Sequence, residues 1–169
     1  SFLWICNGAD APRHYNGSAW ATPSMSGVTT TTIIGVEVFK ERLLLTMTGS
    51  LSFGYLPVDS VAGTVSTFNL GSVFSRGGHL MATKTWTRDG GSGPDDLAIF
   101  YSSEGEVAVY SGTNPASADA WALVGVFFVG RPMEYCCRNI QCVFWMGRDC
   151  LRKRRICLIQ CAKCNNRFI

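Results

Sequence analysis

Cysteines near the C-terminal end have the spacing of metal ligands. Cys157, Cys161 and Cys164 form the pattern C-x3-C-x2-C, and Cys150 precedes them. A structural zinc ion takes four thiolate or imidazole ligands, usually as two close pairs. Cys161 and Cys164 would make one such pair, whereas six residues separate Cys150 from Cys157, which makes a poor second pair. Zinc at these four cysteines is therefore kept as an alternative, and the main expectation is that the chain holds no metal and no cofactor.

A glycine-rich segment resembles a calcium-binding loop. Residues 90–97 read GGSGPDDL, which fits the nonapeptide pattern G-G-x-G-x-D-x-U. In that pattern backbone carbonyls and an aspartate from successive turns share each ion, so binding requires tandem copies. This sequence has one copy. We therefore expect a hairpin loop in which glycine supplies positive φ, without bound calcium.

Glu104 and Glu106 are the acids whose spacing comes closest to that of a glycosidase pair. Residues two apart in a strand share a face, so two such carboxylates could act together on a sugar. Gly105 between them predicts a hairpin turn, however, and a solvated hairpin end is the simpler interpretation. Neither His14 nor His79 lies near a serine or cysteine in a nucleophile motif. We therefore expect no enzyme activity and no small-molecule substrate.

The segments that carry these residues have the pattern of strands. Short runs of β-branched and aromatic residues recur about every ten residues, separated by turn residues such as Gly, Pro, Asn and Ser. No segment of ten or more residues has the spacing of an amphipathic helix. The expected strands are residues 36–39, 43–47, 51–56, 80–86, 97–101, 106–110 and 121–129. The predicted fold class is all-β, built from antiparallel meanders.

An internal repeat indicates a propeller-like arrangement. Residues 3–20 read strand, turn, strand, Tyr-x-Gly and Ala-Trp, and residues 98–121 repeat that order with an inserted loop. Tyr15 and Tyr110 stand 95 residues apart, close to two units of the ~40–50 residues of a propeller blade. The repeat predicts about three blades, and because closed propellers usually have at least four, further sequence or partner chains would complete the ring. A chance likeness of two hairpins is the alternative.

Aromatic residues within the strand patterns are expected to fill the core. A tryptophan in a strand more often packs in a core than it stacks on a base or a sugar. The residues expected to carry the structure, none of them catalytic, are Trp4, Tyr15, Trp20, Tyr55, Tyr110 and Trp121. Trp86 is expected to be buried in the same way.

Charge and cysteine content divide the chain at about residue 132. Residues 1–131 carry seven Lys and Arg against ten Asp and Glu, a balance of −3, whereas residues 132–169 carry eight against two, a balance of +6. Seven of the eight cysteines also fall in the second part. The mildly acidic first part lacks the concentration of Lys and Arg that binds nucleic acid. The longest apolar run, residues 121–129, has about half of the ~20 residues of a membrane-spanning helix, so no membrane association is expected.

The predicted domains are an antiparallel β domain over residues 1–131 and a Cys- and Arg-rich tail over residues 132–169. The tail lacks a turn pattern and contains four consecutive basic residues at 152–155. A shift of reading frame near residue 132 would produce such a segment, and a tail of that origin would not be selected to fold. The sequence begins in a strand pattern without an initiator Met, which agrees with a fragment of a longer protein.

Several stretches of the first part resemble a family of bacteriophage virion proteins. They read LWICNGAD (3–10), LSFGYLPV (51–58), FNLGS (68–72), SEGEVAVYSGTNP (103–115), WALVGV (121–126) and VGRP (129–132). Residues 1–132 resemble the propeller-like tail hub, nozzle or packaged-DNA stabilisation proteins of short-tailed phages and prophages. Residues 103–115 are the most specific of these stretches, and the resemblance stops at Pro132.

The resemblance implies a structural role without an active site. The expected function is that of a component of a phage or prophage tail or connector complex, assembled with other virion proteins in a homo-oligomeric ring. The protein would be made in the bacterial host cytoplasm, reside in the virion, and help to retain or conduct DNA through the complex, with only indirect DNA contact. The alternative is a small β-domain whose zinc-stabilised, basic C-terminal module binds nucleic acid.

Overall fold

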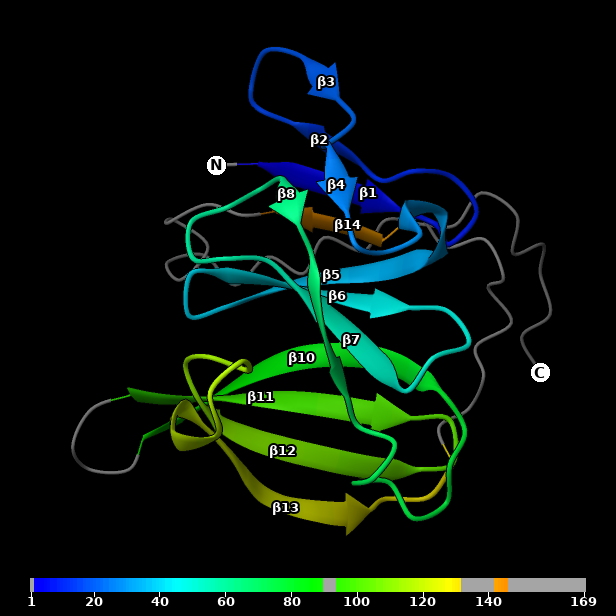
Figure 1. Cartoon of the computed structure of the whole chain (residues 1–169), viewed down its shortest axis with the longest axis vertical. Helices are drawn as coiled ribbons and strands as arrows, with labels where there is room; N and C mark the ends of the chain where they lie inside the picture. Colours follow the sequence, from blue (N-terminus) through cyan, green and yellow to red (C-terminus); the bar gives the residue numbers. More distant parts are fainter. Residues whose placement is uncertain (1, 90–93, 132–141, 146–169) are drawn as a thin grey trace, which may run out of the picture.

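Three four-stranded sheets make up most of the structure. The computed structural model describes residues 2–89, 94–131 and 142–145, and Figure 1 shows the three sheets following one another along its longest axis. The described residues contain no α-helix and two short 3-10 turns, η1 (Thr30–Thr32) and η2 (Ala118–Ala120). All neighbouring strands within the three sheets are antiparallel. The prediction of an all-β, antiparallel fold is confirmed.

The first sheet has the strand order β14-β1-β2-β3. Its strands are β1 (Leu3–Cys6), β2 (Arg13–Tyr15), β3 (Trp20–Ala21) and β14 (Cys142–Trp145). Asparagine side chains shape both of its turns. The Asn7 side-chain oxygen accepts hydrogen bonds from the backbone N–H of Ala9 and Asp10, and that of Asn16 does the same for Ser18 and Ala19. Such side-chain bonds replace a backbone turn, which is why asparagine is frequent there.

The second sheet has the order β5-β6-β7-β9. Its strands are β5 (Ile33–Phe39), β6 (Arg42–Met47), β7 (Ser52–Tyr55) and β9 (Ser66–Asn69). Lys40 and Glu41 connect β5 to β6 with φ angles of 44° and 64°. Positive φ at both central residues gives the turn whose twist matches that of the paired strands. A separate two-stranded parallel pair joins β4 (Met25–Ser26) to β8 (Gly63–Thr64).

The third sheet has the order β10-β11-β12-β13. Its strands are β10 (Leu80–Asp89), β11 (Pro94–Ser102), β12 (Glu106–Gly112) and β13 (Trp121–Phe128). Val109 pairs with Gly125 and Tyr110 with Leu123, so β13 has one extra residue, Val124, at a bulge. All seven strands expected from the sequence are present, with ends that differ by one to three residues in most cases. The sequence patterns missed β9, because three of its four residues are polar.

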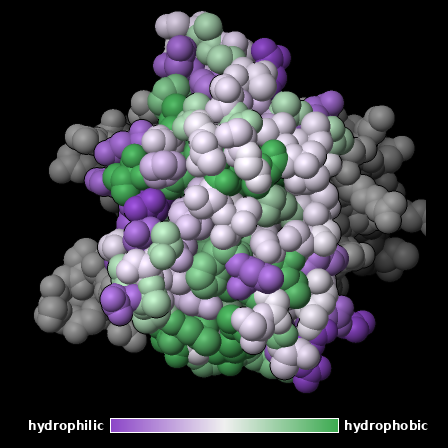
Figure 2. All heavy atoms as spheres, viewed as in Figure 1, coloured by the Kyte–Doolittle hydropathy of each residue, from purple (hydrophilic) through white to green (hydrophobic). Residues whose placement is uncertain are grey.

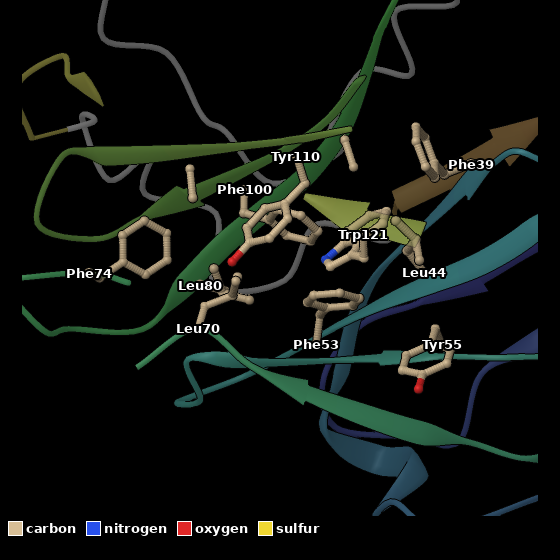
Figure 3. Packing of buried hydrophobic residues seen from close by; sticks show 12 residues of the cluster. Phe39, Leu44, Phe53, Tyr55, Leu70, Phe74, Leu80, Phe100, Tyr110 and Trp121 are labelled. Atoms are coloured by element: carbon tan, nitrogen blue, oxygen red, sulfur yellow. The ribbon is translucent and has the colours of Figure 1, made fainter. Parts of the chain in front are cut away.

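Clusters of buried side chains fill the space between successive sheets. Between the first and second sheets the cluster comprises Trp4, Cys6, Ile33, Val36, Leu43, Leu45, Leu56 and Val65. Between the second and third it comprises Phe39, Leu44, Phe53, Tyr55, Leu70, Phe74, Leu80, Ala98, Phe100, Ala108, Tyr110 and Trp121 (Figure 3). Phe53 of β7 stacks on Phe100 of β11 with ring centroids 4.4 Å apart. A third cluster, of Leu97, Ile99, Val107 and Val109, lies on the opposite face of the third sheet.

The repeat seen in the sequence corresponds to two similar hairpins. Tyr15 in β2 contacts Trp20 at the start of β3, with ring centroids 5.3 Å apart, and Tyr110 in β12 stacks on Trp121 at the start of β13 at 5.1 Å. The two sheets also correspond at their other edge. In the first sheet β14 pairs with β1, and in the third sheet β10 pairs with β11 at the same position in the strand order. Two hairpins therefore share both their ring pair and their place in a sheet.

Two of the tryptophans expected in the core are exposed instead. Trp4 and Trp121 are buried as predicted, as are Tyr55 and Tyr110. Trp20 is 41% exposed because β3 is a two-residue strand at the edge of its sheet, and its ring is covered on one side by Tyr15. Trp86 is 63% exposed because it pairs with Leu97, on the face of the third sheet that points away from the second. The strand pattern gives the two faces of a sheet but does not tell which one is covered.

Candidate functional site

Glu106 is the buried acid that needs an explanation, since only 5% of its surface is exposed. One carboxylate oxygen accepts two hydrogen bonds from Ser75, from its Oγ at 2.7 Å and from the Ser75 backbone N–H at 3.2 Å. The other accepts the backbone N–H of Arg76 at 2.8 Å. Burial raises the pKa of Glu106, but these hydrogen bonds and the charge of Arg76 outweigh it and leave the pKa below its usual value.

This arrangement gives Glu106 a structural role. A general acid must hold its proton near neutral pH, which requires a raised pKa. Glu106 is instead an ionised acceptor that fastens the segment between β9 and β10 to the start of β12. Glu104 lies in the turn before it and forms an ion pair with the exposed Arg131. The two carboxylates that the sequence paired therefore serve two different contacts.

Most of the candidate metal ligands from the sequence fall outside the described residues. Cys150, Cys157, Cys161 and Cys164 lie outside the described residues, as do Gly90 to Gly93 of the calcium-like segment. Asp96 of that segment accepts a hydrogen bond of 2.6 Å from Oγ1 of Thr87 across the β10–β11 hairpin. No group of three or more His, Cys, Asp or Glu side chains suited to a metal ion occurs in the part of the chain that the structure describes.

One of the two histidines lies in a strand and the other in a connecting segment. His14 in β2 packs against Phe2 and Trp4, with ring centroids 5.1 and 5.4 Å apart. Its Nδ1 and the Nε1 of Trp4 are both buried without a hydrogen-bond partner. His79 precedes β10, and its backbone N–H donates to Oγ of Ser103.

The most distinctive surface feature is the outer strand of the third sheet, β13. Its exposed apolar side chains, together with the next residue, are Leu123, Val124, Val126, Phe127, Phe128 and Val129, each 38% to 64% exposed. Figure 2 shows hydrophobic side chains gathered at the lower end of the molecule, where Figure 1 places β13. We call these six residues the β13 apolar surface. They belong to both faces of the strand, because successive residues of a strand point to opposite sides.

One charged group partly covers this surface. The Arg76 guanidinium lies over the Phe128 ring at 4.1 Å from its centroid, a cation–π geometry. The same residue donates its backbone N–H to Glu106, so the segment between β9 and β10 is held to the third sheet at two places. The sequence contained the signal for this surface in the apolar run 121–129, which is too short for a membrane-spanning helix and was predicted to be a strand, but its exposure was not predicted. Among the described residues, no helix is long and apolar enough to cross a membrane.

Comparisons with known proteins found no relative: no protein-family model, no curated protein and no solved structure matches the chain.

Proposed function

We propose that this chain is a structural component of a phage or prophage tail or connector complex. It assembles with other virion proteins in a homo-oligomeric ring and helps to retain or conduct DNA through that complex. The β13 apolar surface carries the proposal. Large contiguous apolar areas on a soluble domain mark sites of contact with other proteins, and this one lies at the end of the succession of sheets.

The packing of the sheets supports a scaffolding role. Aromatic rings of β7, β11, β12 and β13 pack against one another between the second and third sheets. The buried hydroxyls of Thr46 and Thr83 form a hydrogen bond between the same sheets, and Lys84 forms an ion pair with Glu37. A domain held in this way presents its outer strands in fixed positions, as a subunit of an ordered complex requires. The acidic balance of residues 1–131 favours indirect DNA contact through the complex over direct binding.

The succession of sheets also suits the propeller arrangement within this proposal. Each sheet packs on the next through an apolar cluster, and β14 takes the place in the first sheet that β10 takes in the third. In propellers, radially repeated four-stranded sheets pack in this manner. Three blades of one chain would then be completed by neighbouring sequence or subunits.

Virion analysis tests the proposed function. Virions from an induced culture of the source strain are purified on a density gradient, and peptides of residues 1–131 are quantified by mass spectrometry. We expect these peptides to sediment with virions and with detached tail complexes at a fixed ratio to the other tail proteins. Peptides present in the cell lysate but absent from both particle fractions would overturn the proposal.

A further inference from the structure

The outer strand of the third sheet, β13, differs from β9, the outer strand of the second sheet, in the side chains that it exposes. β9, the outer strand of the second sheet, carries Ser66, Thr67 and Asn69, all exposed and polar. β13 has no charged or proline residue, and its exposed side chains are apolar. Strands that face water are usually protected by charges, proline or bulges, since an unprotected edge pairs with another strand. The one such device in β13 is the bulge at Val124, and the exposed side chain there is itself apolar.

The charges that flank β13 are of opposite sign. Asp119, exposed in η2, precedes the strand, and Arg131, with a side chain 75% exposed beside Glu104, follows it. A two-fold arrangement of two such strands runs antiparallel, so Asp119 of each copy lies toward Arg131 of the other, whose guanidinium also forms an ion pair with Glu104. Gly125 lies midway between Asp119 and Arg131 in the sequence. A side chain there would come within 3.2 Å of the Phe127 ring, so the bare backbone leaves room for that ring near the centre of the pair.

From these observations we infer that β13 pairs edge to edge with β13 of a second copy of this chain, joining two third sheets into one continuous sheet. Antiparallel pairing satisfies the outward backbone groups of both strands and sets the β13 apolar surface of each copy beside that of the other. A two-fold contact of this kind is self-complementary and closes at the dimer. The inference rests on the proposed assembly role and names its first partner, since such dimers would be the units of the larger ring.

The test compares two matched pairs of lysine substitutions in the full chain. Val124→Lys with Phe127→Lys places charges at two exposed positions of β13, and Ser66→Lys with Thr67→Lys places the same charges on β9. Sedimentation velocity over a concentration series gives the mass of each protein. We expect the unsubstituted chain and the β9 variant to reach twice the 18.4 kDa of one chain, and the β13 variant to dissociate at least about tenfold more readily.

Hydrogen–deuterium exchange of the unsubstituted chain provides a second measurement that does not depend on a variant's folding. We expect the backbone amides of β13 to become more protected as concentration rises, while those of β9 stay unchanged. A monomer at every concentration, a dimer that the β13 substitutions leave intact, or an open-ended oligomer would each overturn the inference. A monomer in solution together with peptides in virions would refute the dimer while leaving the structural role supported.

Discussion

Oγ of Ser75 donates a hydrogen bond of 2.7 Å to the carboxylate of Glu106. This contact joins the segment between β9 and β10 to the first residue of β12, 31 residues further along the chain. With the backbone N–H groups of Ser75 and Arg76 it gives a buried carboxylate three donors. An ionised acid therefore fixes the segment that connects the second sheet to the third. In the same segment, the Arg76 guanidinium covers the Phe128 ring.

Removing this charge is expected to lower stability most at neutral pH. In Glu106→Gln an NH2 group replaces one of the two carboxylate oxygens, so a donor faces the N–H or O–H donors that the oxygen accepted from. Leaving such buried groups without an acceptor costs about 1–3 kcal/mol. Because hydrogen bonding holds the pKa of the folded protein below that of the unfolded chain, the charge stabilises the fold above the unfolded-state pKa. That contribution is lost as pH falls through the folded-state pKa. Urea unfolding should therefore show a difference in the free energy of unfolding between wild type and variant that is larger at neutral pH than at acidic pH.

Glu104→Gln is the matched control. It removes an ion pair with the exposed Arg131, and such surface pairs contribute at most about 1 kcal/mol. Equal losses for the two variants, or a Glu106 effect that does not change with pH, would contradict the structural role assigned to Glu106.

A buried hydroxyl pair between the second and third sheets should show strong coupling. Oγ1 of Thr46 donates to Oγ1 of Thr83 at 2.9 Å, and both side chains are buried. Thr83→Val leaves the Thr46 hydroxyl unsatisfied, at a cost of about 1–3 kcal/mol, whereas replacing both by valine removes donor and acceptor together. The free energy of unfolding of the double variant should therefore lie closer to wild type than the sum of the single variants predicts. Additive losses in this double-mutant cycle would show that the hydroxyls do not interact.

The tryptophans separate core packing from surface exposure. Trp121 is 5% exposed and its ring stacks on Tyr110, so Trp121→Ala should destabilise the protein by about 3–5 kcal/mol. Trp86 is 63% exposed, and substitutions at such positions usually change stability by no more than about 0.5 kcal/mol. Thermal unfolding followed by circular dichroism distinguishes the two. A large loss for Trp86→Ala would mean that this ring packs against another surface in solution.

Strand positions could be predicted because each strand is short, rich in β-branched or aromatic residues and bounded by turn residues. Ile99 and Phe100 show what such patterns leave open. Adjacent in β11, they belong to clusters on opposite faces of the third sheet, and both are apolar. With both faces apolar, alternation gives no information on which sheet lies against which face. The burial of Trp121 and the exposure of Trp86 follow from that packing.

The candidate site could be predicted only in part. Gly105 correctly indicated a turn, but the expected solvated hairpin end was wrong for Glu106, which is 5% exposed. The hydrogen-bond partners that bury it lie about thirty residues earlier, in a segment without a strand pattern. Contacts over such distances depend on how the sheets pack. The β13 apolar surface was visible in the sequence as an apolar run, yet an exposed edge strand and a buried central strand have the same composition.

Removing the tail in two steps tests whether β14 belongs to the fold. β14 pairs with β1 over four residues, with Leu3 opposite Trp145 and Cys6 opposite Cys142. Deletion of residues 132–169 should free the backbone groups of β1 on that side, so its amides should exchange faster, while those of β12 serve as the internal reference. Deletion of residues 146–169 keeps β14 and should preserve the protection of β1. If both deletions leave β1 as protected as in the full chain, β14 adds nothing to the first sheet, as a tail produced by a shifted reading frame would predict.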